Sequence, residues 1–106
     1  MNSPKIDLLF PLHGHAIPLD HGYVLYAALA RALESSGDCW LHDREDVGVH
    51  LIRGHYQGKG RLALNAGSRL TVRLPATLVH KFLALAGQQL TLGTDSLRVG
   101  IPQPRA

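Results

Sequence analysis

Cysteine is almost absent from this 106-residue chain, and its scarcity narrows the class of protein. The single Cys39 excludes an internal disulfide framework and is compatible with a reducing cytoplasm, which is the expected location. No apolar run is long enough to cross a bilayer, because Pro11, Pro18 and several histidines interrupt the best candidates. The N-terminal residues, with one lysine and a short apolar run, do not resemble a signal peptide. The sequence therefore predicts a globular protein that does not use a membrane.

Carboxylates are missing from residues 47–94, which carry six basic residues. Residues 1–46 show the opposite balance, with seven acidic residues and three basic ones. A long segment without a carboxylate favours a polyanion partner or an acidic protein surface, whereas a merely solvated basic face is the alternative. Besides Lys81, the basic residues are five candidate nucleic-acid contacts: Arg53, Lys59, Arg61, Arg69 and Arg73. They would bind phosphates with little reading of sequence.

Aromatic residues are also few, and the basic strands lack the aromatic pair typical of an RNA-recognition-motif sheet. We therefore do not expect bases to stack on the sheet. The pair His13 and His15 has no cysteine or carboxylate cluster beside it, so neither a metal site nor a cofactor is expected. Cys39 is expected to have a buried structural role.

The apolar residues that are present follow strand and helix periods. Residues 5–12 and 68–74 alternate and predict strands. Asp20 is a suitable N-cap for a helix whose apolar stripe begins at Leu25, and Gly37 is the expected C-terminal cap. A second helix is expected to begin at Pro75 and to end at Gly87. Further strands are expected at 47–53, 61–65, 88–92 and 96–99.

The connections between these elements are predicted from their turn residues. Residues 54–61 are rich in glycine and predict a hairpin tip. Residues 13–19 and 38–46 are expected as loops, the second pinned to the core by Trp40 and Leu41. The final residues IPQPRA carry no core signal and are expected as a tail.

The predicted order is strand, helix, strand, strand, helix, strand, with one extra short strand. Two right-handed crossovers around an antiparallel sheet give an α+β, ferredoxin-like (RRM-like) βαββαβ sandwich with both helices on one face. The chain length fits a single domain over residues 1–106.

His42 is the strongest candidate for chemistry. An imidazole titrates near neutrality and can accept or donate a proton, and Arg44, two residues on, would stabilise charge on a phosphate. The ordinary alternative is a loop histidine without a catalytic role. His21 is expected to support the start of the first helix, and His50 to pack in the sheet.

Several separated blocks of the sequence together resemble the N-terminal half of the CRISPR-associated repeat-RNA endoribonucleases, the Cas six family, and in particular its MYXAN-type subtype. The blocks are IDLLFPLHGHAIPLDHGYVLYAALARAL, WLHD, GVHLIRGHYQGKGRLAL, SRLTVRLPA, LALAGQQL and LRVG. The resemblance implies two tandem ferredoxin-like domains, of which this chain would hold the first. It also implies metal-independent cutting of precursor CRISPR RNA within repeats, where a ribose 2′-hydroxyl attacks the adjacent phosphate and leaves a 2′,3′-cyclic phosphate. CRISPR repeat RNA is the implied partner; other CRISPR-associated proteins and a homodimer stay open.

The resemblance also assigns roles to residues. In many members a histidine just after the first helix, in a Leu-His context, is the general acid/base, and His42 stands there. Many members carry a tyrosine in the first helix; Tyr26 is the counterpart considered, although the closest register falls on Ala30. Where others carry a lysine after the histidine, this chain has Arg44, with Gly48 at the nearest equivalent spacing. The predicted catalytic residues are therefore His42, Arg44 and Tyr26. Because the second domain is not in this chain, a catalytically silent module that binds RNA or docks on a partner is the alternative.

Overall fold

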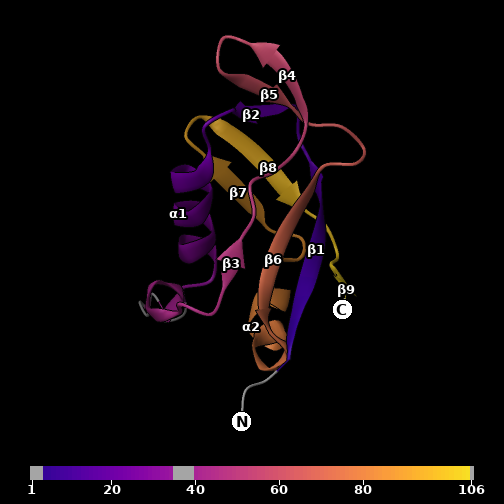
Figure 1. Ribbon diagram of the computed structural model, residues 1–106. Coiled ribbons are helices and arrows are strands. Elements are labelled where there is room, and N and C mark those ends of the chain that lie inside the picture. Colours follow the sequence, from indigo (N-terminus) through magenta and orange to yellow (C-terminus); the bar gives the residue numbers. More distant parts are fainter. Residues whose placement is uncertain (1–3, 35–39, 106) are drawn as a thin grey trace.

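The main sheet of this domain has the strand order β3-β6-β1-β8-β7, with β9 paired to β1 as a sixth strand. The computed structural model describes residues 4–34 and 40–105, without the side chains of His42 and Asp43. The six strands are β1 Lys5–His13, β3 Gly48–Val49, β6 Arg69–Pro75, β7 Gln89–Leu92, β8 Asp95–Val99 and β9 Gln103–Arg105. Every pairing in this sheet is antiparallel. Without β7 and β9, the strand order is β3-β6-β1-β8, which is that of a ferredoxin-like sheet (Figure 1). The predicted α+β fold is confirmed, and β7 is the extra short strand.

Strand β1 sets the two faces of the sheet. Leu8, Phe10 and Leu12 are buried in the core, whereas the alternate residues of β1 point to the other face. A shift of one residue in the pairing of β1 with β6 would exchange the faces, so the alternation fixes the register. The predicted strands at 5–12 and 68–74 are confirmed.

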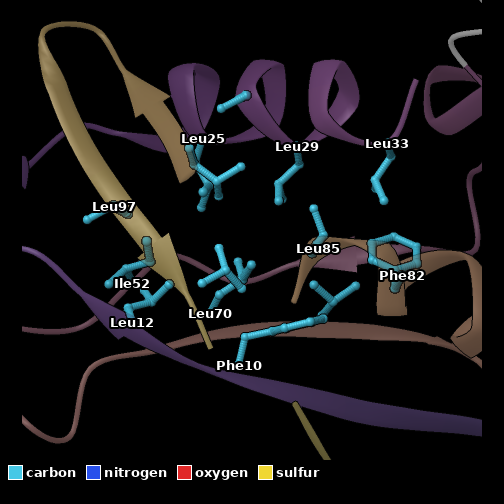
Figure 2. Close-up of a cluster of buried hydrophobic side chains, with 14 of the residues drawn as sticks. Phe10, Leu12, Leu25, Leu29, Leu33, Ile52, Leu70, Phe82, Leu85 and Leu97 are labelled. Atoms are coloured by element: carbon cyan, nitrogen blue, oxygen red, sulfur yellow. The ribbon is translucent and has the colours of Figure 1, made fainter. Parts of the chain in front are cut away.

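The helices cover one face of the sheet, as predicted. Helix α1 (Gly22–Ala32) directs Leu25 and Leu29 into the same cluster as Phe10 and Phe82, as Figure 2 shows. The second helical segment begins after Pro75 and ends before Gly87, as predicted, but only its middle turn is α-helical. It consists of three consecutive pieces, η2 Ala76–Leu78, α2 Val79–Phe82 and η3 Leu83–Leu85. The chain leaves them at Ala86, and Gly87 turns with a positive φ of 83°.

A second, three-stranded sheet in the order β2-β5-β4 lies at the end of the molecule away from the N-terminus (Figure 1). Its strands are β2 Ala16–Pro18, β4 His55–Gly58 and β5 Arg61–Ala63. The prediction that residues 13–19 form only a loop is therefore wrong, and the hairpin tip narrows to Lys59 and Gly60. Of the strand predicted at 47–53, only the two residues of β3 form a strand. A Cβ at Gly54 would collide with the carbonyl oxygen of Ala63, so glycine permits the close approach with which the chain enters the small sheet.

The C-terminal residues also form a strand, although the sequence predicts a tail. Strand β9 runs antiparallel to β1, with Gln103 opposite Leu9 and Arg105 opposite Asp7. All three side chains of β9 are exposed, so the strand is held mainly by its backbone and leaves no hydrophobic pattern in the sequence.

Two further expectations concern residues outside the described ranges, namely the Gly37 cap and the buried role of Cys39. No helix within residues 4–34 and 40–105 is long and apolar enough to cross a membrane.

Candidate functional site

The predicted catalytic histidine belongs to η1, a 3-10 turn over Trp40–Asp43. The hydroxyl of Tyr26 donates a hydrogen bond of 3.0 Å to the Leu41 carbonyl, and Trp40 Nε1 donates one of 2.9 Å to the Leu33 carbonyl. Both bonds tie η1 to α1, and the Leu41 side chain is buried. The side chain of His42 lies outside the described part of the structure, so its role in proton transfer stays a prediction.

Trp40 joins η1 to the second helix as well. Its ring meets Phe82 edge-on, with 5.6 Å between ring centroids, and the ammonium of Lys81 lies 4.7 Å from the Trp40 ring centre. The prediction that Trp40 and Leu41 pin this segment to the core is confirmed. The backbone that carries His42 is therefore held to both helices by its immediate neighbours.

Arg44 forms an ion pair with Asp46 close to η1. Its Nε and Nη2 donate to the two carboxylate oxygens at 3.0 and 2.7 Å. The hydrogen bond from Arg44 lowers the pKa of Asp46. Both side chains are more than one-third exposed, at 38% and 36%, so solvent weakens the pair. The pair uses Nε and Nη2 and neutralises much of the charge of Arg44, so a phosphate competes with Asp46 for this guanidinium.

His21 is buried at the start of α1, where it occupies the N-cap position that the sequence assigns to Asp20. Its Nδ1 lies 2.9 Å from the Pro18 carbonyl, and its Nε2 accepts a hydrogen bond of 2.8 Å from the Ile52 N–H. These partners select the neutral ring with its hydrogen on Nδ1. The expected structural role of His21 is confirmed, since it holds the segment after β3 against the start of α1.

Basic side chains gather on the face of the main sheet that the helices leave uncovered, which we call the open face. In the register of β1 and β6, Asp7 is opposite Arg73 and Pro11 is opposite Arg69, and β9 places Arg105 beside Asp7. A depression of about 250 Å³, the Asp7 depression, is lined by Asp7, Leu9, His50, Leu51, Arg53, Gly67, Arg69, Thr71 and Arg105. A second one of about 330 Å³ shares Leu9, Arg69 and Arg105 with it. The arginines thus border a continuous surface.

The five predicted RNA contacts separate into two groups. Arg53 and Arg69 line the Asp7 depression, and Arg73 is exposed beside it. Lys59 and Arg61 belong instead to the β4–β5 hairpin. Both terminal nitrogens of Arg61 donate to Asp95 at 2.8 Å, so this guanidinium is occupied by an ion pair.

The sequence does not predict two residues of the open face, Arg105 and His50, as site residues. Arg105 stands in the segment predicted as a tail, and its charge was the only available signal. His50 was expected to pack in the sheet, and this is wrong. Its backbone N–H bonds to the Thr71 carbonyl at 3.0 Å, but its side chain is exposed and lines the Asp7 depression.

Within the described ranges, no three histidine, cysteine, aspartate or glutamate side chains are grouped to hold a metal ion.

The family model described as Cas6 Crispr matches residues 6–106. The chain belongs to the Cas6 family. A CRISPR-associated endonuclease Cas6 of Myxococcus xanthus (strain DK1622) is 40% identical over an alignment of 105 positions, which covers 93% of this chain and 44% of that relative. A solved structure of a CRISPR associated protein Cas6 superimposes with a TM-score of 0.72 at 17% identity, over 97% of this chain and 49% of that one; this likeness supports the fold alone. The resemblance inferred from the sequence is confirmed, and this Cas6 chain spans less than half the length of both proteins.

Proposed function

We propose that this domain supplies the general acid/base and an RNA-binding face of a metal-independent endoribonuclease that cuts CRISPR repeat RNA. Membership of the Cas6 family supports the reaction class. The observation that carries the assignment of His42 is the anchoring of η1 by Tyr26 and Trp40, because a catalytic side chain needs a fixed backbone.

The proposed reaction needs only proton transfer and charge stabilisation. The ribose 2′-oxygen attacks the adjacent phosphorus, and the bond from phosphorus to the 5′-oxygen breaks. His42 takes the 2′-hydroxyl proton or protonates the leaving 5′-oxygen, and either step suits an imidazole near neutral pH. Arg44, released from Asp46, would stabilise the charge that develops on the phosphate. Tyr26 acts as a positioning residue through the Leu41 carbonyl.

Strand β3 is the edge strand of the main sheet and follows η1 in the chain. Gly48 pairs with Arg73, and only a short connection separates Gly48 from η1. A single-stranded RNA lying across Arg53, Arg69 and Arg73 would therefore pass the β3 edge on its way to His42. Phosphate contacts of this kind fix the position of the strand without reading bases.

A chimera tests the assignment of His42. This chain replaces the matching half of the Myxococcus xanthus relative, and cleavage of that relative's repeat RNA is measured in the presence of a chelator. We expect His42→Ala to slow cleavage by roughly 10²- to 10⁴-fold, the usual contribution of a general acid or base. His80→Ala, an exposed histidine of α2, is the matched control and should cleave normally. Equal cleavage by both variants removes His42 from the mechanism, and dependence on metal overturns the metal-free proposal.

The alternative function is RNA binding without cleavage. The Arg44–Asp46 pair favours it, because this pair occupies the cation expected beside the reacting phosphate. Asp46→Ala separates the two functions in the same chimera. If the domain is catalytic, freeing Arg44 should raise the cleavage rate; a chimera that binds repeat RNA but cuts in neither form supports the silent module.

A further inference from the structure

A carboxylate lies in the middle of the cationic open face. Asp7 stands on β1 between Arg73 of β6 and Arg105 of β9, each directly opposite it in register. Its side chain is 16% exposed and lines the Asp7 depression. Both arginines lie within ion-pair distance of this carboxylate, which offsets their mutual repulsion, but its negative charge also weakens the attraction of the open face for phosphate.

Neither arginine satisfies the carboxylate. Nη1 of Arg73 is 3.6 Å from Oδ1 and Nη2 of Arg105 is 3.9 Å from Oδ2. Hydrogen bonds between a guanidinium and a carboxylate are about 2.7 to 2.9 Å long, so both contacts are too long. Oδ1 is buried and has no hydrogen-bond partner among the residues that the structure describes. Burial of Oδ1 leaves Oδ2, the oxygen nearer Arg105, as the acceptor that we assign to a ligand.

We propose that the Asp7 depression is a ribose subsite for single-stranded RNA, where the Asp7 carboxylate accepts a hydrogen bond from a 2′-hydroxyl. Arg53, Arg69 and Arg105 hold the phosphates on either side of that ribose. The inference rests on the proposed RNA-binding face and adds to it a means of distinguishing RNA from DNA.

The chemistry of the depression favours a sugar over a base. In RNA the 2′-hydroxyl is attached next to the carbon that carries the 3′-phosphate, so a carboxylate among phosphate-binding arginines meets the sugar first. The lining holds no phenylalanine, tyrosine or tryptophan, and the small ring of His50 is its one aromatic surface on which a base could stack. One accessible oxygen suits one hydroxyl donor, whereas specific reading of a base edge generally uses a pair of hydrogen bonds.

The test compares the affinity of the 106-residue chain for a mixed-sequence RNA oligonucleotide and for its DNA counterpart. The wild type should prefer RNA, and Asp7→Ala should reduce the RNA-to-DNA affinity ratio by about tenfold, as expected for one hydrogen bond to a charged group. Loss of the negative charge should leave DNA binding equal or stronger. Asp7→Asn keeps an oxygen acceptor without the charge, so it should retain more of the preference for RNA than Asp7→Ala does.

Glu34→Ala is the matched control, since it removes an exposed carboxylate at the end of α1. Its RNA-to-DNA ratio should equal that of the wild type. RNA oligonucleotides with single 2′-deoxy substitutions give a second readout: one position should weaken binding to the wild type and have no effect on Asp7→Ala. A ratio unchanged by Asp7→Ala overturns the ribose subsite alone. Absence of salt-dependent binding to RNA overturns the proposed binding face and the subsite together.

Discussion

His21 uses both nitrogens of a buried ring to hold backbone from two parts of the chain. His21→Ala would open a cavity and leave the Ile52 N–H without its partner, so we expect the free energy of unfolding to fall by about 3 kcal/mol. Denaturant unfolding measures the loss, and the exposed His55→Ala is the control. A loss below about 1 kcal/mol would show that the fold does not depend on this ring.

The candidate site residues differ in how far they could be predicted from the sequence. The resemblance to the Cas six family is what singles out His42, because many members carry a Leu-His pair just after the first helix. Asp7, in contrast, is the ordinary polar member of an alternating strand, and only the register with β6 and β9 shows that it faces two arginines. The ion pair between Arg61 and Asp95 could not be predicted either, because the two residues are distant in sequence.

Among the structural elements, η1 depends on Tyr26 for its attachment to α1. Tyr26→Phe removes the hydrogen bond to Leu41, so we expect a loss of about 1 kcal/mol in stability. In the chimera, cleavage should slow because His42 is less well placed, while the pH dependence of the rate keeps its shape. A changed pH profile would instead indicate that the Tyr26 hydroxyl takes part in proton transfer.

The Arg61–Asp95 pair connects β5 of the small sheet with β8 of the main sheet. Its hydrogen bonds lower the pKa of Asp95 below the ordinary aspartate range, so the folded state favours the charged carboxylate. The resulting stabilisation is present above the ordinary aspartate pKa and is lost as the pH falls through the lowered one. Asp95→Asn should therefore be less stable than the wild type at neutral pH, and the difference should shrink in acid. Thermal unfolding across pH measures this; a gap independent of pH would exclude the ion pair as its cause.

The elements were predictable where a strand or helix is long enough to carry a side-chain pattern and unpredictable where it is too short to show one. Strands β1 and β6 alternate clearly, and helix α1 shows a continuous apolar stripe. Strands β2 and β9 are short and contain proline, and their pairing partners lie elsewhere in the chain. No hydrophobic period marks them, so β2 and the pairing of β9 with β1 appear only in the folded structure, whereas β5 of the small sheet falls within the strand predicted at 61–65.

At the scale of the whole molecule, folding places arginines from distant parts of the chain on one face. Arg53 and Arg69 come from the acid-free segment, and Arg105 joins them through β9. Each phosphate contact releases counterions, so RNA affinity should fall as salt increases. Arg69→Ala should weaken binding to any sequence and reduce the slope of log affinity against log salt concentration by about 1.

Arg31→Ala is the control for this measurement, because Arg31 is exposed on α1, on the helical side of the sheet. Equal slopes for Arg69→Ala and Arg31→Ala would mean that RNA does not use the open face. Arg69 is already oriented by hydrogen bonds of 2.8 and 3.0 Å to the carbonyls of Ala66 and Ser68. Less side-chain entropy is therefore lost when Arg69 meets a phosphate, so Arg69→Ala should weaken binding more than loss of the exposed Lys59 of the hairpin.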